Sequence, residues 1–347
     1  MVEKLFNHKR RKKILFYSSV KTKKMFSIQQ FYRTDIYILR ELGYTVILSK
    51  SIFNYFLFWK YDIAFIYFYR YGLFPALIAK LFSKKVIFTG GIDYLDRKYA
   101  GIKSYIIQKI FINLCNLFSD KNILVSNSDL VNVRKAIKSF NPSNFPLSFH
   151  VINCEDFVYD IITNKKKIFC TIAWMLQTEN VIRKGVDKSI LLFKEIYLID
   201  PDFRMIIIGP KGEGTAYIYE IIKKEKLEEV VSFTGAIDEK SKIKILQESS
   251  IYSQLSIYEG FGIASIEALA AGNIVIHTGK GGLADAIGVN GILTSGESYQ
   301  IIAKKLFNIL YNNELRLKMV RQGIDHVSKN FSYAKRYNDF ENIFKSI

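Results

Sequence analysis

Cysteine, proline and histidine are scarce in this chain. Its 347 residues include 3 cysteines, 5 prolines and 4 histidines. Cys115, Cys154 and Cys170 lie far apart and form no CxxC pair, so the sequence offers neither a zinc ribbon nor a CxxC redox centre. We interpret all three as small buried thiols, which places the chain in a reducing cytoplasm.

Long uninterrupted apolar runs are also missing. The aromatic-rich stretch 53–82 comes closest, but charged residues interrupt it before the roughly 18 apolar residues of a membrane-spanning helix accumulate. These interruptions are Lys60, Asp62, Arg70 and Lys80. No signal-peptide pattern is evident, because Lys12-Lys13 is followed by a short strand-like run and then by polar residues. The sequence therefore predicts a cytoplasmic protein that is peripheral rather than integral to a membrane.

Acidic residues are few in the first half of the chain. Residues 1–150 carry 25 Lys and Arg against 8 Asp and Glu, a net charge of +17, whereas residues 151–347 carry 25 against 24. Nine basic residues fall between Lys4 and Lys24. Such a cluster is either a solvated basic face or an attachment to an anionic membrane or a phosphate-bearing acceptor. Each cation near anionic lipid is worth about 1 kcal/mol, so half of the nine would supply roughly 4–5 kcal/mol.

Short runs rich in Ile, Val, Phe and Tyr alternate with longer segments of helical period. This is the pattern of parallel sheets with crossover helices. In the first half we expect strands at 14–17, 45–49, 63–67, 85–88, 121–125 and 150–152, and helices at 28–41, 73–82, 102–118 and 128–139. In the second half we expect strands at 168–173, 204–208, 230–233, 251–255, 274–277 and 291–293, and helices at 186–197, 215–225, 239–248, 262–271 and 300–312.

This alternation predicts an α/β protein with two Rossmann-like, doubly wound domains that face each other across a cleft. Ligands in such folds bind at the carboxyl ends of the strands. The polar segment Asp160 to Lys167 is the expected linker. The domains would comprise residues 1–165 and 166–330, and residues 331–347 would form a C-terminal helix that returns to the first domain.

The strongest motif is Glu259-Gly-Phe-Gly-Ile-Ala-Ser-Ile-Glu267, which continues as Ala-Leu-Ala-Ala-Gly272. Gly260 and Gly262 allow the backbone to approach a ligand closely. The helix expected to begin there presents unpaired N–H groups and a positive dipole end, which suit a diphosphate. The two carboxylates could each accept hydrogen bonds from vicinal hydroxyl groups. On spacing alone, an ordinary strand–turn–helix with an acidic start also fits.

This segment resembles the acidic motif of the family-4 retaining glycosyltransferases, which build polysaccharides, glycolipids and related glycoconjugates from nucleotide sugars. Their motif is Glu-(any seven)-Glu, with Gly-Phe-Gly after the first glutamate and Ala-(any)-Gly after the second. The similarity extends through the glycine-rich turn 279–282. The resemblance implies a GT-B fold in which Glu259 contacts the transferred sugar and Glu267 the ribose hydroxyls. The donor-binding turn between them comprises Gly260, Phe261, Gly262 and Ile263.

A second element is Arg183-Lys184-Gly185-Val186-Asp187, expected at the start of a helix. It is either a solvated helix start or a site where two cations neutralise a leaving nucleoside diphosphate, each charge-assisted bond being worth about 1.5–3 kcal/mol. In the resembling family a lysine before this glycine contacts the donor diphosphate, which points to Lys184 with Arg183 as its neighbour. Family members usually carry another arginine after the preceding strand, but residues 171–175 contain none.

Three further positions follow from the resemblance. Gly235 and Ala236 would contact the nucleobase through their backbones. Asp93, after Gly90-Gly91-Ile92, is similar to a Gly-Gly-x-Asp turn that borders the donor sugar and the acceptor in some members; the histidine that many relatives use nearby is not evident. No Asp-x-Asp pair lies near these motifs, so we expect no metal and no cofactor besides the donor substrate.

The predicted reaction is transfer of a sugar from a nucleoside-diphosphate sugar, with UDP favoured, to an acceptor hydroxyl with retention at the anomeric carbon. Glu259, Lys184 and Asp93 are the predicted catalytic residues, and no protein nucleophile is required. The acceptor would be a glycan or lipid-linked molecule of cell-surface polysaccharide, lipopolysaccharide, capsule or glycolipid assembly at the inner face of the membrane. The alternative is an inactive GT-B-fold binding partner in such an assembly complex. Nucleic acid is not expected, because the basic cluster lacks interleaved aromatic residues.

Overall fold

The computed structural model describes residues 11–157 and 165–347 and divides them into two compact units. Unit 1 comprises the described residues up to Val125, together with Asp129–Ser148 and Arg336–Ile347. Unit 2 comprises Ser126–Ser128 and the described residues of Phe149–Lys335. The last residues of the chain therefore rejoin the unit that its first half builds.

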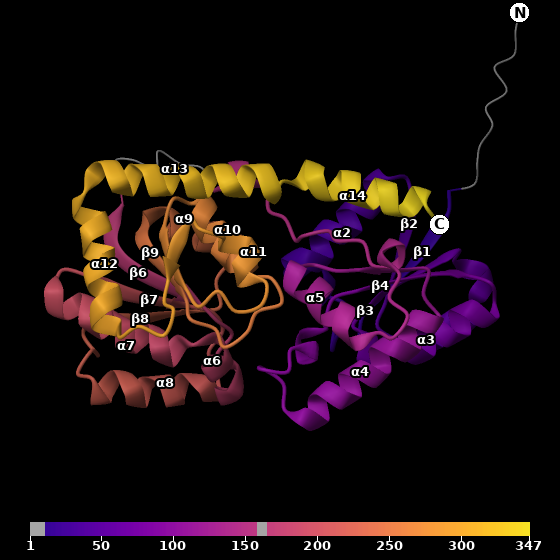
Figure 1. Cartoon of the computed structure of the whole chain (residues 1–347), viewed down its shortest axis with the longest axis horizontal. Coiled ribbons are helices and arrows are strands. Elements are labelled where there is room, and N and C mark those ends of the chain that lie inside the picture. The colour runs from indigo at the N-terminus through magenta and orange to yellow at the C-terminus, as the bar shows by residue number, and fades with distance from the viewer. Residues whose placement is uncertain (1–10, 158–164) are drawn as a thin grey trace, which may run out of the picture. The chain divides into compact units, whose positions relative to one another are not determined.

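Unit 1 is built on a parallel five-stranded sheet in the order β2-β1-β3-β4-β5. The strands are β1 (Lys13–Tyr17), β2 (Thr45–Ser49), β3 (Ile63–Tyr67), β4 (Lys85–Thr89) and β5 (Lys121–Ile123). The helices are α1 (Met25–Ile28), α2 (Gln30–Glu41), α3 (Tyr69–Leu81), α4 (Ile102–Leu117), α5 (Asn127–Ala136) and α14 (Tyr333–Lys345). The short 3-10 turns are η1 (Ile52–Phe56), η2 (Phe58–Lys60), η3 (Asp93–Leu95) and η4 (Pro142–Asn144), whereas a fifth, η5 (Cys154–Asp156), belongs to unit 2. Central strand β3 has no charged residue and is buried throughout, as a strand covered on both faces requires. Helices α3 and α4 lie side by side (Figure 1).

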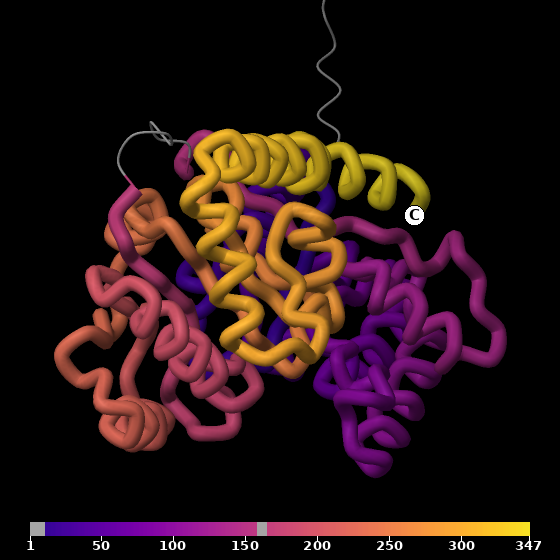
Figure 2. The backbone as a smooth tube through the Cα atoms, turned by 60° about the vertical axis from the view of Figure 1, so that its left-hand side comes forward, coloured from indigo at the N-terminus to yellow at the C-terminus, as the bar shows by residue number. Residues whose placement is uncertain are grey.

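Unit 2 has a parallel six-stranded sheet in the order β11-β10-β9-β6-β7-β8. Its strands are β6 (Lys166–Ile172), β7 (Arg204–Ile208), β8 (Val231–Gly235), β9 (Ser249–Gln254), β10 (Ile274–His277) and β11 (Gly291–Leu293). Its helices are α6 (Thr178–Lys184), α7 (Val186–Ile199), α8 (Glu213–Lys224), α9 (Glu239–Glu248), α10 (Ile263–Ala270), α11 (Leu283–Ile287), α12 (Tyr299–Tyr311) and α13 (Asn313–Asn330). One core lies under α7, α8 and α12, and another under α10, α11 and α13. Helix α12 turns sharply into α13 (Figure 2).

The last helix is tied to unit 1 by a buried ion pair and by aromatic packing. Arg336 of α14 and Asp35 of α2 are both fully buried, and Nε of the arginine lies 2.7 Å from Oδ1 of the aspartate. Nη2 of Arg336 donates to the other oxygen of Asp35 at 2.9 Å, and the hydroxyl of Tyr67 donates to that same oxygen. Phe340 packs against Phe65 of β3. Residues 336–347 therefore share the core of unit 1.

Most strands and helices occur where the sequence predicts them, but three expectations about the segment 149–167 need correction. Residues 150–152 form no strand; Ile152 makes only an isolated bridge to Ser332. The division between the units falls at 148/149 rather than 165/166, because Phe149 stacks on Phe261 in the core of unit 2. Residues 158–164 of the expected linker lie outside the described residues, and Lys166 and Lys167 belong to β6.

Candidate active site

The site is centred on the carboxylate of Glu259, which follows β9 in a turn before α10. Its side chain is 9% exposed, and Oε1 accepts a hydrogen bond from Nζ of Lys184 at 2.7 Å. Ser256 and Gln254 donate to the same oxygen at 2.8 and 3.1 Å. Burial alone would raise the pKa of Glu259, but the charges of Lys184 and Arg183 and the hydrogen bonds from Lys184 and Ser256 hold it below its usual value. Glu259 is therefore an anion at neutral pH.

Lys184 reaches this position from the end of a helix, whereas its sequence context predicts the start of one. Arg183 and Lys184 form the last turn of α6, and Gly185 is both its C-cap and the residue before α7. Gly185 has a φ of 68°, and a Cβ there would lie 2.0 Å from the carbonyl oxygen of Leu255. Cations favour the negative end of a helix dipole. A side chain at residue 185 would push Arg183 and Lys184 away from the residues that connect β9 to the acidic motif.

Arg183 lies beside the same turn and contacts its backbone. Its Nη1 donates to the carbonyl oxygen of Tyr258 at 3.4 Å, and Nη2 donates to Asn180 at 2.8 Å. The amide N–H of Ile257 donates to the carbonyl oxygen of Arg183 at 2.8 Å. The structure thus brings together both predicted cations and the first glutamate of the motif, which are 75 or more residues apart in sequence.

The second glutamate, Glu267, lies inside α10, as the motif predicts, and is also backed by a lysine. Its side chain is 3% exposed, and Oε1 lies 2.8 Å from Nζ of Lys242 on α9. Lys242 also pairs with Glu239 at 2.8 Å. Burial would lower the pKa of Lys242, but the two carboxylates raise it above its ordinary value, so this lysine stays charged. The sequence gives no signal for Lys242, because its spacing from Glu267 carries no motif.

The glycine-rich turn 279–282 holds the backbone of the acidic motif. Glu259 forms a parallel bridge with Gly281, and the N–H of Gly282 donates to the carbonyl oxygen of Glu259 at 2.7 Å. Gly281 has a φ of 64°, and a Cβ there would come within 2.1 Å of that carbonyl oxygen. The hydroxyl of Thr278 donates to the carbonyl oxygen of Ser256 at 2.7 Å. This turn therefore fixes the backbone at Glu259 through close contacts that only glycine permits.

The residues between the two glutamates differ in what they can offer a ligand. Gly262 caps α10 with a φ of 107°, and Ile263 is the first residue of that helix. Gly260 is partly exposed, whereas the ring of Phe261 is buried against Phe149 and Phe331. The first N–H groups of a helix have no partner within it. The turn can therefore present backbone donors to an anion, and any contact from Phe261 must come from its backbone.

The remaining predicted residues occupy strand and turn ends. Gly235 ends β8 with a φ of 71°, and a Cβ there would meet no atom within 4 Å; Ala236 follows it and is exposed. Asp93 belongs to unit 1, is partly exposed and opens η3 after Gly91, whose φ is 70°. Their roles toward a ligand stay predictions. Within residues 11–157 and 165–347, no three His, Cys, Asp or Glu side chains gather into a possible metal site.

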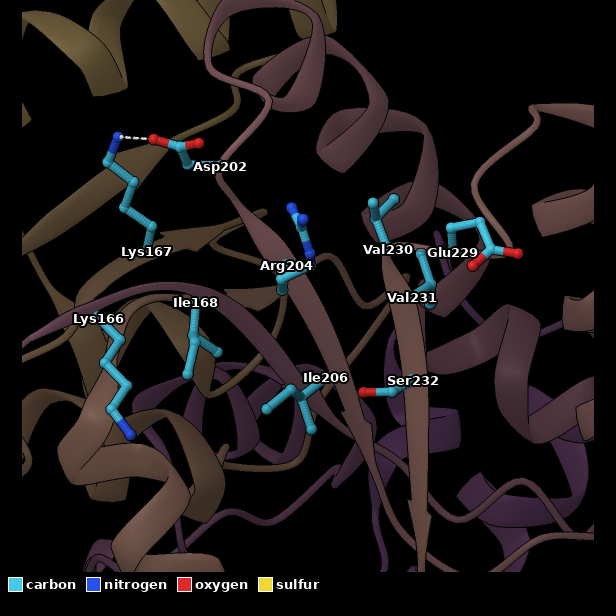
Figure 3. A pocket seen from close by; sticks show the side chains of 10 residues that line it. All are labelled: Lys166, Lys167, Ile168, Asp202, Arg204, Ile206, Glu229, Val230, Val231 and Ser232. Atoms are coloured by element: carbon cyan, nitrogen blue, oxygen red, sulfur yellow. Dashed lines mark hydrogen bonds and ion pairs between the residues drawn. The ribbon is translucent and has the colours of Figure 1, made fainter.

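A pocket of about 400 Å³ opens elsewhere in unit 2, over β6, β7 and β8 (Figure 3). None of the predicted site residues lines it. Ile168, Ile206 and Ser232 lie along its strands, and Lys167 reaches across to Asp202 at 2.9 Å. Lys166, Lys167 and Arg204 line it together with Asp202 and Glu229, so its wall mixes cations and carboxylates.

Comparisons with known proteins find similarity to glycosyltransferases. Residues 164–326 match the family model for glycosyl transferases group 1. The chain is 24% identical over 296 residues to an uncharacterized glycosyltransferase of Methanocaldococcus jannaschii, covering 78% of this chain and 72% of that protein. It is also 24% identical over 256 residues to one of the subunits of human phosphatidylinositol N-acetylglucosaminyltransferase, covering 73% of this chain but only 50% of that protein.

The solved structures extend the similarity to both units. The structure of HepE from Anabaena in complex with UDP and glucose has a TM-score of 0.77 and 14% identity, and it covers 97% of this chain and 100% of that one. The two parallel sheets and this likeness show that the fold is GT-B, as the acidic motif implies. This structural match includes unit 1, whereas the family model covers only residues 164–326, which lie in unit 2.

Proposed function

We propose that this glycosyltransferase with the GT-B fold moves a sugar from a UDP-sugar to an acceptor hydroxyl with retention at the anomeric carbon. The observation that carries the proposal is the 2.7 Å pairing of Lys184 with Glu259 inside the region that matches the family model. The UDP and glucose bound by HepE support UDP as the nucleotide. The donor sugar is the activated substrate, and we propose no metal or other cofactor.

The charges of the site suit departure of a nucleoside diphosphate. Lys184 is 23% exposed and its ammonium has three donors, of which one is directed at Glu259, so others remain for a phosphate. Arg183 and the first N–H groups of α10 add further positive potential. Stabilisation of the leaving group by such fixed donors is a large contribution to catalysis. The departing phosphate would accept the proton of the acceptor hydroxyl, so no protein nucleophile is invoked.

The two carboxylates would orient the donor. We propose that Glu259 accepts hydrogen bonds from hydroxyls of the transferred sugar and that Glu267 accepts them from the ribose. Gly260, Gly262 and Ile263, with the backbone of Phe261, would contact the diphosphate or the sugar, and Gly235 and Ala236 the uracil. Asp93 would serve the acceptor; the left-handed glycine turn before it and its partial exposure support this role.

We further propose a lipid-linked acceptor at an anionic membrane surface, in the assembly of cell-surface polysaccharide or glycolipid. Unit 1 exposes a cluster of aromatic side chains on η1, η2, α3 and its C-cap Phe82, in which Phe53 and Trp59 are 72% and 59% exposed. Ring contacts join its members: Phe56 with Phe74, and Phe58 with Phe82. Residues 50–85 contain six Lys or Arg and a single acidic residue, Asp62.

This combination of aromatic rings and cations fits the interface of an anionic bilayer. Part of the basic cluster, Lys4, Lys9 and Arg10, lies outside the described residues, whereas Lys21, Lys23 and Lys24 are exposed. None of the described helices is long and apolar enough to cross a membrane. The human relative is named for transfer to phosphatidylinositol, which supports a lipid acceptor.

A second candidate is a GT-B protein that binds but does not turn over its donor, as a partner in a membrane-associated assembly complex. The observation that favours it is the loop after β6, residues 173–177, which carries no cation at the place where the resembling family has an arginine. Donor binding without hydrolysis or transfer would support this candidate.

The test combines binding and turnover. UDP, GDP and ADP are compared by thermal shift; we expect UDP at about 100 times its dissociation constant to stabilise the protein by roughly 2.7 kcal/mol. Hydrolysis of UDP-glucose and UDP-N-acetylglucosamine is then followed for the wild type and for Glu259→Ala, which we expect to lose several orders of magnitude in turnover while keeping its fold. Near wild-type turnover of Glu259→Ala would remove the catalytic assignment. Absence of any nucleotide effect would remove the donor proposal.

A further inference from the structure

Glu259 is held from behind by a chain of buried polar side chains on β9 and the residues after it. Tyr252, Gln254 and Ser256 are each at most 1% exposed. The hydroxyl of Tyr252 donates to Oε1 of Gln254 at 2.5 Å, and Nε2 of Gln254 donates to Oγ of Ser256 at 2.7 Å. Nε2 also donates to Oε1 of Glu259 at 3.1 Å. The amide nitrogen of Gln254 therefore contacts both Ser256 and the carboxylate.

The three contacts to the carboxylate are one-sided. Lys184, Ser256 and Gln254 donate to Oε1. No donor among residues 11–157 and 165–347 hydrogen-bonds to Oε2, and that atom is not among the fully buried polar atoms without a partner. The chain of donors thus fixes one oxygen and leaves the other available to a hydroxyl of the substrate.

A polar chain in this place is costly unless it is complete. The strands of a buried parallel sheet are normally near-continuous runs of apolar residues, yet β9 reads Ser-Ser-Ile-Tyr-Ser-Gln. Buried polar groups that lack a partner are expensive, whereas a fully satisfied network rigidifies its members. Here Tyr252, Gln254 and Ser256 satisfy one another and end on Glu259. Their arrangement is therefore suited to setting the direction of that carboxylate.

We propose that Gln254, supported by Tyr252, is a positioning residue that holds Oε1 of Glu259 so that Oε2 faces the donor sugar. This inference rests on the proposed role of Glu259. Gln254 touches no substrate in this proposal and acts only through the carboxylate. Replacing Gln254 should therefore lower the rate of the chemical step. It should leave the affinity for UDP unchanged, because UDP lacks the transferred sugar.

The experiment compares Gln254→Leu with a Tyr252→Phe/Gln254→Leu double variant. Turnover is measured with the faster of UDP-glucose and UDP-N-acetylglucosamine, and UDP affinity by calorimetry. We expect kcat to fall about tenfold or more in both variants, in line with the loss of a hydrogen bond to a charged group, with the dissociation constant of UDP within about twofold of the wild-type value. The double variant strands no buried hydroxyl, so it should melt closer to the wild type than the single variant and remain measurable if Gln254→Leu folds poorly.

Two controls separate the outcomes. Ser253→Ala removes the neighbouring buried hydroxyl, which donates to Ser189 and lies on the other face of the strand; it should leave kcat unchanged. Glu259→Gln should abolish turnover. The positioning role is overturned if Glu259→Gln is inactive but the folded double variant keeps the wild-type kcat. It is also overturned if the kcat and the UDP affinity of the double variant fall together. If Glu259→Gln itself keeps turnover, the proposed function fails instead.

Discussion

At the scale of the residue, each glutamate of the acidic motif is paired with a lysine from a neighbouring helix. Lys184 of α6 approaches Glu259, and Lys242 of α9 approaches Glu267, both through Oε1 at 2.7 and 2.8 Å. Each lysine supplies the counter-charge that a buried carboxylate needs. The charge and the hydrogen bond of Lys184 help to hold the pKa of Glu259 below its usual value, so this carboxylate is ionised and can accept hydrogen bonds from sugar hydroxyls.

Lys184→Ala should weaken UDP binding with the fold retained. A lost charge-assisted hydrogen bond of about 1.5–3 kcal/mol corresponds to a rise of about tenfold to a hundredfold in the dissociation constant, measured by calorimetry. Lys305→Ala is the matched control, because Lys305 of α12 pairs with Glu297 at 2.6 Å, outside the proposed site. If the Lys184 and Lys305 variants have equal affinities for UDP, Lys184 does not bind the phosphates.

At the scale of the element, α14 depends on one arginine. The side chains of Arg336 and Asp35 are 0% exposed and the pair is bidentate, with a further donor bond from Nη1 to the carbonyl oxygen of Ser148 at 2.6 Å. Such a pair is no guarantee of high stability, because both ions give up their hydration. Breaking it is a different matter, since a carboxylate would then be buried without its counter-charge.

Arg336→Leu should therefore destabilise unit 1 by about 3–5 kcal/mol, measured by urea unfolding. Lys345→Ala on the same helix removes only an exposed pair with Glu341 and should cost less than about 1 kcal/mol. An Asp35→Leu/Arg336→Leu double variant, which leaves no charge unpaired, should recover part of the loss. An unfolding midpoint of Arg336→Leu equal to that of the wild type would show that the pair does not anchor α14.

At the scale of the whole molecule, the two halves of the chain differ in charge. The net charge of +17 lies in residues 1–150, while residues 151–347 are nearly neutral. The segment that matches the glycosyltransferase model is the neutral one. The excess positive charge therefore lies outside the segment of sequence that carries the proposed donor site, which relies on single lysines paired with carboxylates.

The protein should sediment with vesicles of phosphatidylglycerol and phosphatidylcholine, but not with phosphatidylcholine alone, and binding should weaken as salt is added. Phe53→Ser/Trp59→Ser should weaken binding by at least about tenfold, because a buried large apolar side chain contributes about 1.5–3 kcal/mol. Tyr311→Ser is the control, an aromatic residue of unit 2 that is 72% exposed. Equal binding to both vesicle types would contradict an anionic surface as partner.

The alternation of strands and helices and the position of the acidic motif can both be read from the sequence alone. Both are local properties: hydrophobic periodicity reports the face that each element buries, and the Glu259 to Glu267 spacing is readable along a single turn and helix. Residues 150–152 have the composition of a strand, so the sequence predicts one there. In the structure they form no strand, and Ile152 makes only an isolated bridge in the core of unit 2. Propensity there is overridden by the packing of the neighbouring Phe149 against Phe261 and Phe331.

Which side chains meet around each carboxylate depends on the tertiary fold. Lys184 and Glu259 are 75 residues apart, Lys242 and Glu267 are 25 apart, and Arg336 and Asp35 are 301 apart. No periodicity links such positions, because the order of strands in each sheet sets their distances. Gln254 is the clearest case: in the sequence it is a polar residue in a strand, and in the fold it connects Tyr252 to Glu259.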